Sequence, residues 1–309
     1  MWLARKTGRT FRPQVSVAAM RAGYVQTNAR YGIKRVAEIE TRELTIPTDD
    51  GTTIGARLYR RVADAGRTLP VLLYFHGGGW VIGDVDSYDR LTRYFACEGR
   101  IAVISVDYRL GPEHRFPRAH EDACDAYAWL LDNGEPLGVD VSRIAVGGDS
   151  AGGGLAASIA AEAEPRGLAR PTFSLLIYPS VDGTARYPSR LQYTSGVPLT
   201  PATIAWFRDH ATNGPADGSM PFLVPLDAPH PERLPPTYVL AAQHDPLVDE
   251  GRAYYERLRA VGVPVVYDLR PALAHGFVNL VGVVPRAKRA LRDAIRATAA
   301  ALGTVSDER

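Results

Sequence analysis

The chain has 309 residues, 46% of them hydrophobic and 23% charged, a balance typical of a globular protein rather than a disordered one. Its 36 basic and 34 acidic residues give a formal net charge of +2, which argues against nucleic acid as a partner. Because no run of about 18 apolar residues occurs and the N-terminus lacks the apolar core of a secretory signal, we expect a cytoplasmic protein without stable membrane insertion.

The N-terminal part of the chain favours helix before the pattern changes to strand. Apolar residues are spread through "VSVAAMRAGYVQTNARYGI", and we expect helical structure up to about residue 38. "TRELTIPT" and "TTIGARLYR" then show β-branched residues and partial alternation on either side of Asp49-Asp50-Gly51. This pattern predicts two antiparallel strands joined by a turn.

Six further short apolar runs predict strands that are buried on both faces. They cover 69–75, 101–106, 143–148, 173–179, 237–242 and 263–269. Segments that favour helix lie between most of them, at 87–98, 118–132, 151–163, 249–261 and 286–301. Strands that alternate with helices predict a mainly parallel sheet, eight-stranded once the first two strands are included, with helices on its faces.

One segment, about 180–235, contains no clear central strand. Within it, "LTPATIAWFRDH" predicts a helix with Thr200 as its N-cap and Pro201 in its first turn. We therefore expect a single α/β domain over 1–309, with a helical cap formed by about 1–40 and about 180–235.

Two glycine-rich turns follow predicted strands. "HGGGW" at 76–80 comes directly after the strand 69–75, and its glycines leave backbone N–H groups free to face a ligand. "GGDSAGGG" at 147–154 lies between a strand and a helix, with Ser150 at the centre of a G-x-S-x-G pattern. This placement is typical of a nucleophile elbow, with an N-capping serine as the alternative. A phosphate loop is excluded because no Gly-Lys-Ser/Thr ending is present.

The two motifs together resemble the hormone-sensitive-lipase branch of the α/β-hydrolases, which includes many bacterial family IV carboxylesterases. "DYRLGPEHRFPRAHEDA" at 107–123 resembles another motif of that branch, from which Gly111, Arg115 and His120 depart. The resemblance implies an α/β-hydrolase fold in which His76 braces the first glycine turn. It also implies an oxyanion hole formed by the backbone of Gly77, Gly78, Gly79 and Ala151.

A serine nucleophile needs a base and an acid, which follow it in the order Ser, acid, His in α/β-hydrolases. His275, in an "HGF" motif similar to that of the family, comes after the last predicted strand and is the expected base. Asp245 comes directly after the strand 237–242 and is the expected acid, whereas Asp249 and Glu250 suit the start of the next helix. His244 is a weaker alternative base.

These residues predict a serine carboxylesterase that hydrolyses short- to medium-chain acyl esters through an acyl-enzyme. An amidase, deacetylase, lactonase or acyltransferase with the same triad stays open. So does, more remotely, a non-catalytic small-molecule receptor. The mechanism needs no organic cofactor, and the histidines show no HExxH spacing that would predict a metal site.

Apolar side chains near these motifs are candidates for the substrate pocket, with ordinary core packing as the alternative. They are Trp80, Tyr178, Leu199, Trp206, Phe207, Leu247 and Phe277. We see no buried basic cluster, so we expect a small uncharged ester as substrate. The resemblance allows a homodimer. Cys97 and Cys124 are expected to be buried free thiols.

Overall fold

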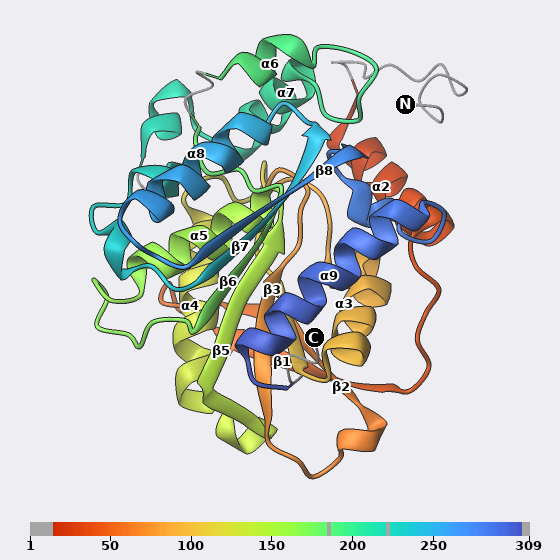
Figure 1. Cartoon of the computed structure of the whole chain (residues 1–309), viewed down its shortest axis with the longest axis vertical. Coiled ribbons are helices and arrows are strands. Elements are labelled where there is room, and N and C mark those ends of the chain that lie inside the picture. Colours follow the sequence, from red (N-terminus) through yellow and green to blue (C-terminus); the bar gives the residue numbers. More distant parts are fainter. Residues whose placement is uncertain (1–14, 184–186, 221–222, 305–309) are drawn as a thin grey trace.

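Eight strands form one sheet in the order β1-β2-β4-β3-β5-β6-β7-β8 (Figure 1). The computed structural model describes residues 15–183, 187–220 and 223–304. The strands are β1 (Ile39–Pro47), β2 (Thr53–Arg61), β3 (Leu69–Phe75), β4 (Ala102–Asp107), β5 (Val139–Asp149), β6 (Phe173–Ile177), β7 (Thr237–His244) and β8 (Val265–Ala274). The pairs β1–β2 and β2–β4 are antiparallel and all other pairs are parallel, which confirms the predicted sheet.

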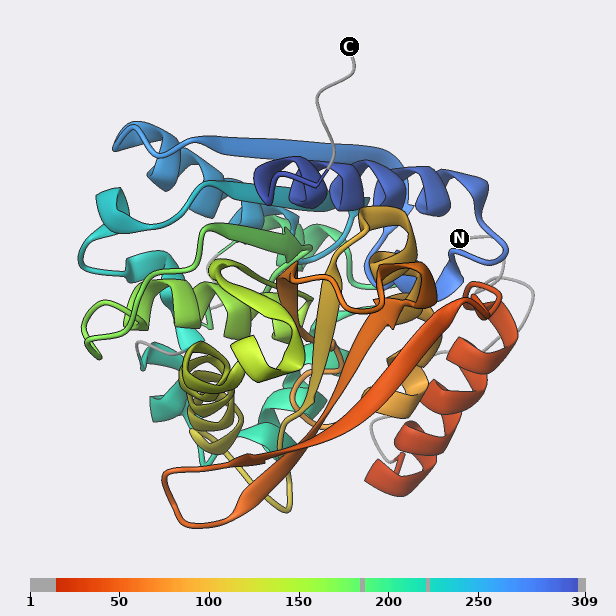
Figure 2. The same cartoon turned by 90° about the horizontal axis from the view of Figure 1, so that it is seen from below.

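Helices cover both faces of the sheet (Figure 2). One core includes side chains from α4 (Arg118–Asn133), α5 (Ala151–Glu162) and α8 (Val248–Ala260), and the other includes side chains from α3 (Val85–Gly99) and α9 (Pro285–Ala301). The central strands are apolar throughout because they are buried on both faces; all seven residues of β3 are buried. Within the described ranges, no helix is long and apolar enough to cross a bilayer.

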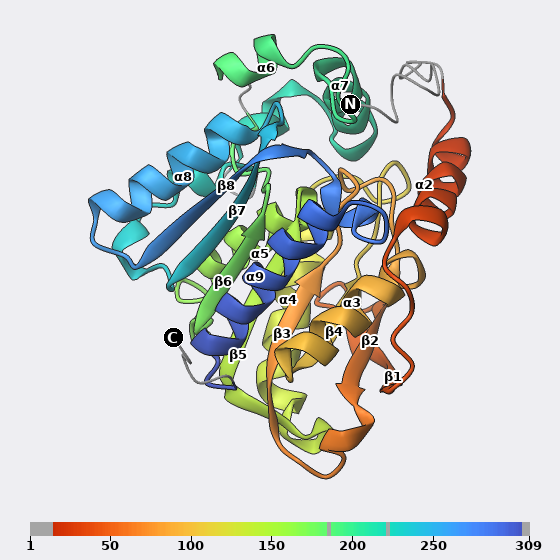
Figure 3. The same cartoon turned by 45° about the vertical axis from the view of Figure 1, so that its right-hand side comes forward.

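Three further helices lie beyond the carboxyl ends of the parallel strands (Figure 3). They are α2 (Val17–Tyr31), α6 (Pro188–Gln192) and α7 (Pro201–Ala211). The predicted N-cap of α7 is confirmed, because the Thr200 side chain accepts a hydrogen bond from the Thr203 N–H at 3.2 Å. The expectation of helix up to residue 38 was too long: α2 ends at Tyr31, and residues 1–14 lie outside the described ranges.

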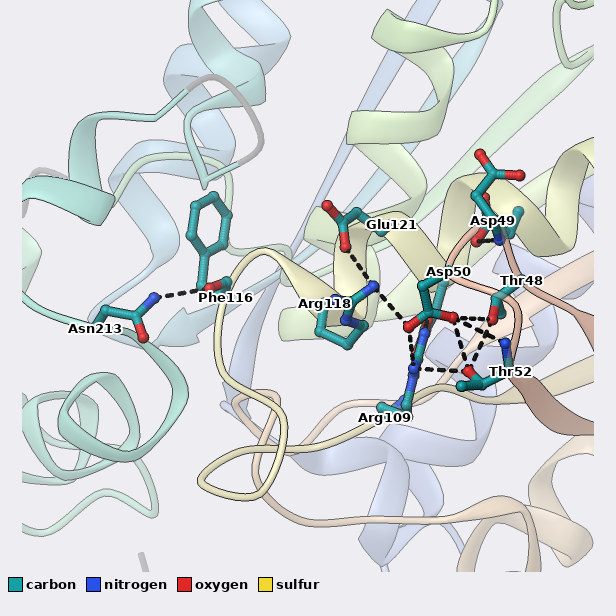
Figure 4. A network of polar contacts seen from close by, with 11 residues as sticks. Thr48, Asp49, Asp50, Thr52, Arg109, Phe116, Arg118, Glu121 and Asn213 are labelled. Carbon is teal, nitrogen blue, oxygen red and sulfur yellow. Dashed lines mark hydrogen bonds and ion pairs between the residues drawn. The ribbon is translucent and has the colours of Figure 1, made fainter.

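The turn between β1 and β2 is tied to the segment after β4 through Asp50 (Figure 4). Asp50 accepts hydrogen bonds from Thr48 at 2.6 Å and from Arg109 at 2.8 Å, and it forms an ion pair with Arg118 at 3.0 Å. The hydrogen bonds from Arg109, which has the largest effect, and from Thr48 hold the pKa of the Asp50 carboxyl well below its usual range. Arg109 also pairs with the buried Asp122, so one guanidinium joins the turn to α4.

The loop at 108–117, which follows β4, holds both helical segments above the sheet. Arg21 on α2 forms an ion pair with Glu113 in this loop at 2.7 Å. Arg115 in the same loop donates a hydrogen bond to the Asp209 carbonyl of α7 at 2.7 Å. The loop is therefore a common attachment point for α2 and α7.

Candidate active site

Ser150 lies at a sharp turn between β5 and α5, as the G-x-S-x-G pattern predicts. Its backbone has φ 55° and ψ −119°, a conformation that costs a non-glycine residue about 1–3 kcal/mol. The Ser150 N–H donates to the Ile177 carbonyl at 2.8 Å, and its carbonyl accepts from the Ser180 N–H at 3.1 Å. At Gly152, a Cβ would lie 2.0 Å from the Phe75 carbonyl oxygen, so only glycine lets the helix approach β3 this closely.

Ser150, His275 and Asp245 form a continuous chain of hydrogen bonds. The Oγ of Ser150 lies 2.9 Å from Nε2 of His275, and Nδ1 of His275 lies 2.7 Å from Oδ2 of Asp245. The Leu247 N–H donates to the other oxygen of Asp245 at 2.8 Å, and this carboxylate is completely buried. An imidazole held in this way can accept the serine proton, while the carboxylate orients the ring and stabilises its charged form.

His275 is the first residue after the last strand, in the turn that follows β8, as expected. The predicted end of the last strand near 269 was too early, because β8 continues to Ala274. The Tyr178 ring packs 4.6 Å from the imidazole and in turn contacts Phe277 edge-on. These contacts fix the plane of the imidazole.

The other candidate acids and bases next to Asp245 make different contacts. The ring of His244 packs edge-on against Tyr193 at 6.0 Å. Asp249 accepts the Ser189 N–H at the start of α6, at 2.9 Å, and Glu250 is buried against Arg190.

The turn 76–80 contains two glycines with positive φ, Gly78 at 124° and Gly79 at 60°. The Gly77 N–H is already occupied, because it donates to both Asp149 and the Tyr88 hydroxyl at 3.0 Å. His76 braces the turn as expected: its Nδ1 lies 2.9 Å from the Gly77 carbonyl oxygen. Burial lowers the pKa of His76 to about 4 and thus keeps its imidazole neutral.

Asp149 is a buried residue of the site that the sequence patterns did not indicate. Besides the Gly77 N–H, its carboxylate accepts from the hydroxyls of Tyr74 at 2.9 Å, Tyr88 at 3.1 Å and Tyr178 at 3.3 Å. Burial raises the pKa of Asp149, while the bonds from Tyr74 and Tyr88 oppose that rise. The sequence feature that could have indicated it is an acid directly after the buried run 144–148, where a carboxylate needs several donors.

A cavity of about 1350 Å³ opens above Ser150 and His275. Its lining includes Gly78, Gly79 and Ala151, along with four of the predicted pocket residues, Trp80, Leu199, Phe207 and Leu247. The other three, Tyr178, Trp206 and Phe277, are buried behind the lining. Helix α2 contributes Met20 and Tyr24 to the wall. Two polar lining residues that the sequence did not indicate are Arg190 and Arg208.

The chain is similar in sequence to known hydrolases. Residues 72–279 match the family described as having the alpha/beta hydrolase fold. The chain is 40% identical to an ethyl acetate hydrolase of Pseudomonas putida over 254 residues, 81% of this chain and 79% of that protein. It is also 40% identical to the esterase LipI of Mycobacterium tuberculosis over 260 residues, 82% of this chain and 79% of that protein.

Solved structures of esterases are similar to this chain over almost its whole length. An esterase of Pyrobaculum calidifontis is 37% identical, with a TM-score of 0.88 and coverage of 97% of each chain. An ester hydrolase from the metagenome of Lake Arreo is 35% identical, with a TM-score of 0.92 and coverage of 98% of this chain and 96% of that one.

Proposed function

The chain belongs to the α/β-hydrolase fold family, in its hormone-sensitive-lipase-like branch, and is a carboxylic ester hydrolase; from this premise we propose that Ser150 is its nucleophile, His275 its general base and Asp245 the acid. The observation that carries the assignment is the hydrogen-bonded chain of 2.9 Å and 2.7 Å that ends on a serine at a strained turn.

In the first half-reaction, Nε2 of His275 takes the Ser150 proton as Oγ attacks the ester carbonyl carbon. The protonated His275 then donates that proton to the departing alkoxide, which leaves an acyl-enzyme. In the second half-reaction, His275 takes a proton from water as the water attacks the acyl carbon, and it then returns a proton to Oγ of Ser150 as the carboxylic acid leaves. Asp245 stabilises the imidazolium in both halves.

For the oxyanion hole we propose the N–H groups of Gly78, Gly79 and Ala151. The engagement of the Gly77 N–H by Asp149 supports a bracing role for Gly77 rather than a donor role. Each donor of this kind contributes about 3 kcal/mol to the stabilisation of a tetrahedral oxyanion.

We further propose that α2 and the segment containing α6 and α7 act as a cap over a small ester. The reacting part of that ester is uncharged, because Trp80, Leu199, Phe207 and Leu247 make much of the lining apolar.

A homodimer is supported by the exposed edge strand β8, where Val266 is 53% exposed, and analytical ultracentrifugation tests it. A cytoplasmic location is supported by the free thiols of Cys97 and Cys124, and cell fractionation tests it.

The decisive experiment compares Ser150→Ala with wild type on p-nitrophenyl butyrate. We expect Ser150→Ala to lose hydrolysis and also to lose stoichiometric labelling by an organophosphate. Ser142→Ala, at the exposed start of β5, is the matched control and should keep both. Near-wild-type turnover by Ser150→Ala would reject the assignment.

A further inference from the structure

Two guanidinium groups face the cavity that contains Ser150. Arg190 is on α6 and Arg208 is on α7, and both belong to the cavity lining. The side chain of Arg190 is 8% exposed, and its Nη2 lies 2.6 Å from Oε2 of the fully buried Glu250. The charge of Arg190 is therefore matched within the protein.

Arg208 differs from Arg190 because it has no ion-pair partner among the described residues. Its Nη2 donates to the Gly183 carbonyl, a neutral acceptor. Burial, followed by repulsion from Arg190, lowers the pKa of Arg208, while the carboxylates of Glu250, Asp209 and Asp182 oppose this through space. A guanidinium has five N–H donors, so most of the donors of Arg208 are available to a ligand.

Building on the proposed function, we propose that Arg208 binds a carboxylate carried by the substrate, so that the enzyme prefers esters with a free carboxylate, such as monoesters of short dicarboxylic acids. The planar fork of an arginine matches the two oxygens of a carboxylate and binds them with geometric selectivity. The reacting ester group would lie at Ser150, and the carboxylate would lie at the part of the wall formed by α7.

The apolar lining and the charged site have separate roles in this proposal. The apolar residues near Ser150 accept the hydrocarbon between the two ends of the substrate, whereas Arg208 recognises the far end. Arg190 is not available to the substrate carboxylate, because Glu250 already pairs with it. Neutral esters remain substrates, since the chemistry at Ser150 does not need Arg208.

The test measures kcat/KM for monomethyl glutarate, adipate and pimelate against their dimethyl esters, by titrating the acid released. Each pair has the same length and differs in one charge. We expect Arg208→Gln to lower kcat/KM for the best monoester by about tenfold or more, mainly through KM, because the contact is made equally in the ground and transition states. The dimethyl esters should stay within about twofold of wild type, and Arg208→Lys should be intermediate.

The control is Arg257→Gln, because Arg257 also donates to a single backbone carbonyl, that of Ala228, but is not part of the cavity lining. If Arg208→Gln changes monoesters and diesters alike at every chain length, Arg208 only anchors Gly183 and the proposal is wrong. This failure differs from a failure of the proposed function, in which Ser150→Ala would still hydrolyse the dimethyl esters.

Discussion

The hydroxyl of Tyr24, on α2, lies 2.6 Å from the hydroxyl of Tyr88, on α3. Tyr88 donates to Asp149 and accepts the Gly77 N–H, while Asn279, four residues after His275, donates to Tyr24 at 3.1 Å. One hydroxyl on α2 therefore joins the glycine turn to the segment that carries His275.

Replacing Tyr24 by Phe removes this hydroxyl and keeps the ring. We expect kcat to fall about three- to tenfold with KM unchanged, because a hydrogen bond contributes about 0.5–1.5 kcal/mol and here positions the reacting groups. Steady-state kinetics on p-nitrophenyl butyrate, with thermal unfolding measured in parallel, checks this. Tyr31→Phe, at the end of the same helix, should behave as wild type. A wild-type kcat in Tyr24→Phe would show that the link has no role in positioning.

Asp245→Asn should lower kcat by about four orders of magnitude, because an amide no longer stabilises the imidazolium and favours the wrong tautomer of His275. The matched control is Asp249→Asn, which changes a neighbouring carboxylate that accepts the Ser189 N–H of α6. We expect Asp249→Asn to keep kcat within a few-fold of wild type. If Asp249→Asn lowered kcat more than Asp245→Asn, Asp249 rather than Asp245 would be the acid.

Gly78→Ala should impair the oxyanion turn more than it destabilises the fold. An added Cβ would lie 2.0 Å from the Ile82 carbonyl oxygen, so the backbone of the turn must move. We expect kcat to fall by about 10²–10³, the loss typical of a missing oxyanion donor. Gly167→Ala imposes a similar positive-φ strain but meets no atom within 4 Å, so it should lose about 1 kcal/mol of stability and no activity.

His120 should make the fold sensitive to acid. Burial lowers the pKa of His120 to about 3 in the folded state, whereas the unfolded chain titrates near the ordinary value of 6.5. Below pH 6.5 the unfolded chain therefore binds a proton that the folded chain does not. The contribution of His120 to stability is complete above pH 6.5 and is lost as the pH falls towards 3.

Between pH 7.5 and pH 5 this loss is about 2 kcal/mol of unfolding free energy. His120→Leu, which introduces an apolar side chain beside Trp80 and Phe116, should remove that part of the loss. Urea unfolding at the two pH values measures it. The exposed His230→Gln should keep the wild-type loss. Equal losses in His120→Leu and wild type would contradict this origin.

The order of elements followed from the sequence because local patterns determine it. Apolar runs of six or seven residues predicted strands with two buried faces, and the motifs around Ser150 and His275 occur where strands end. The end of β8 was misplaced because Arg270 and Pro271 interrupt the apolar run, although the strand continues beside β7 to Ala274.

Contacts between segments that are distant in the sequence could not be predicted from local patterns. Asp149 occupies a variable position of G-x-S-x-G, and its partners Tyr74, Tyr88 and Tyr178 come from three other segments. Arg208 has the spacing of an ordinary polar residue on a surface helix. It is the position of α7 beside the cavity that places the guanidinium of Arg208 near Arg190 rather than in solvent.

The shared attachment of α2 and α7 to the loop 108–117 has a consequence for building chimeric enzymes. An exchange that replaces Glu113 and Arg115 in the loop alone would remove the ion-pair partner of Arg21 and the donor to the Asp209 carbonyl of α7. The two segments and the loop should therefore come from one parent, with a single crossover point placed after α7. Libraries recombined in this way should yield more folded members than those that exchange only the region around α7.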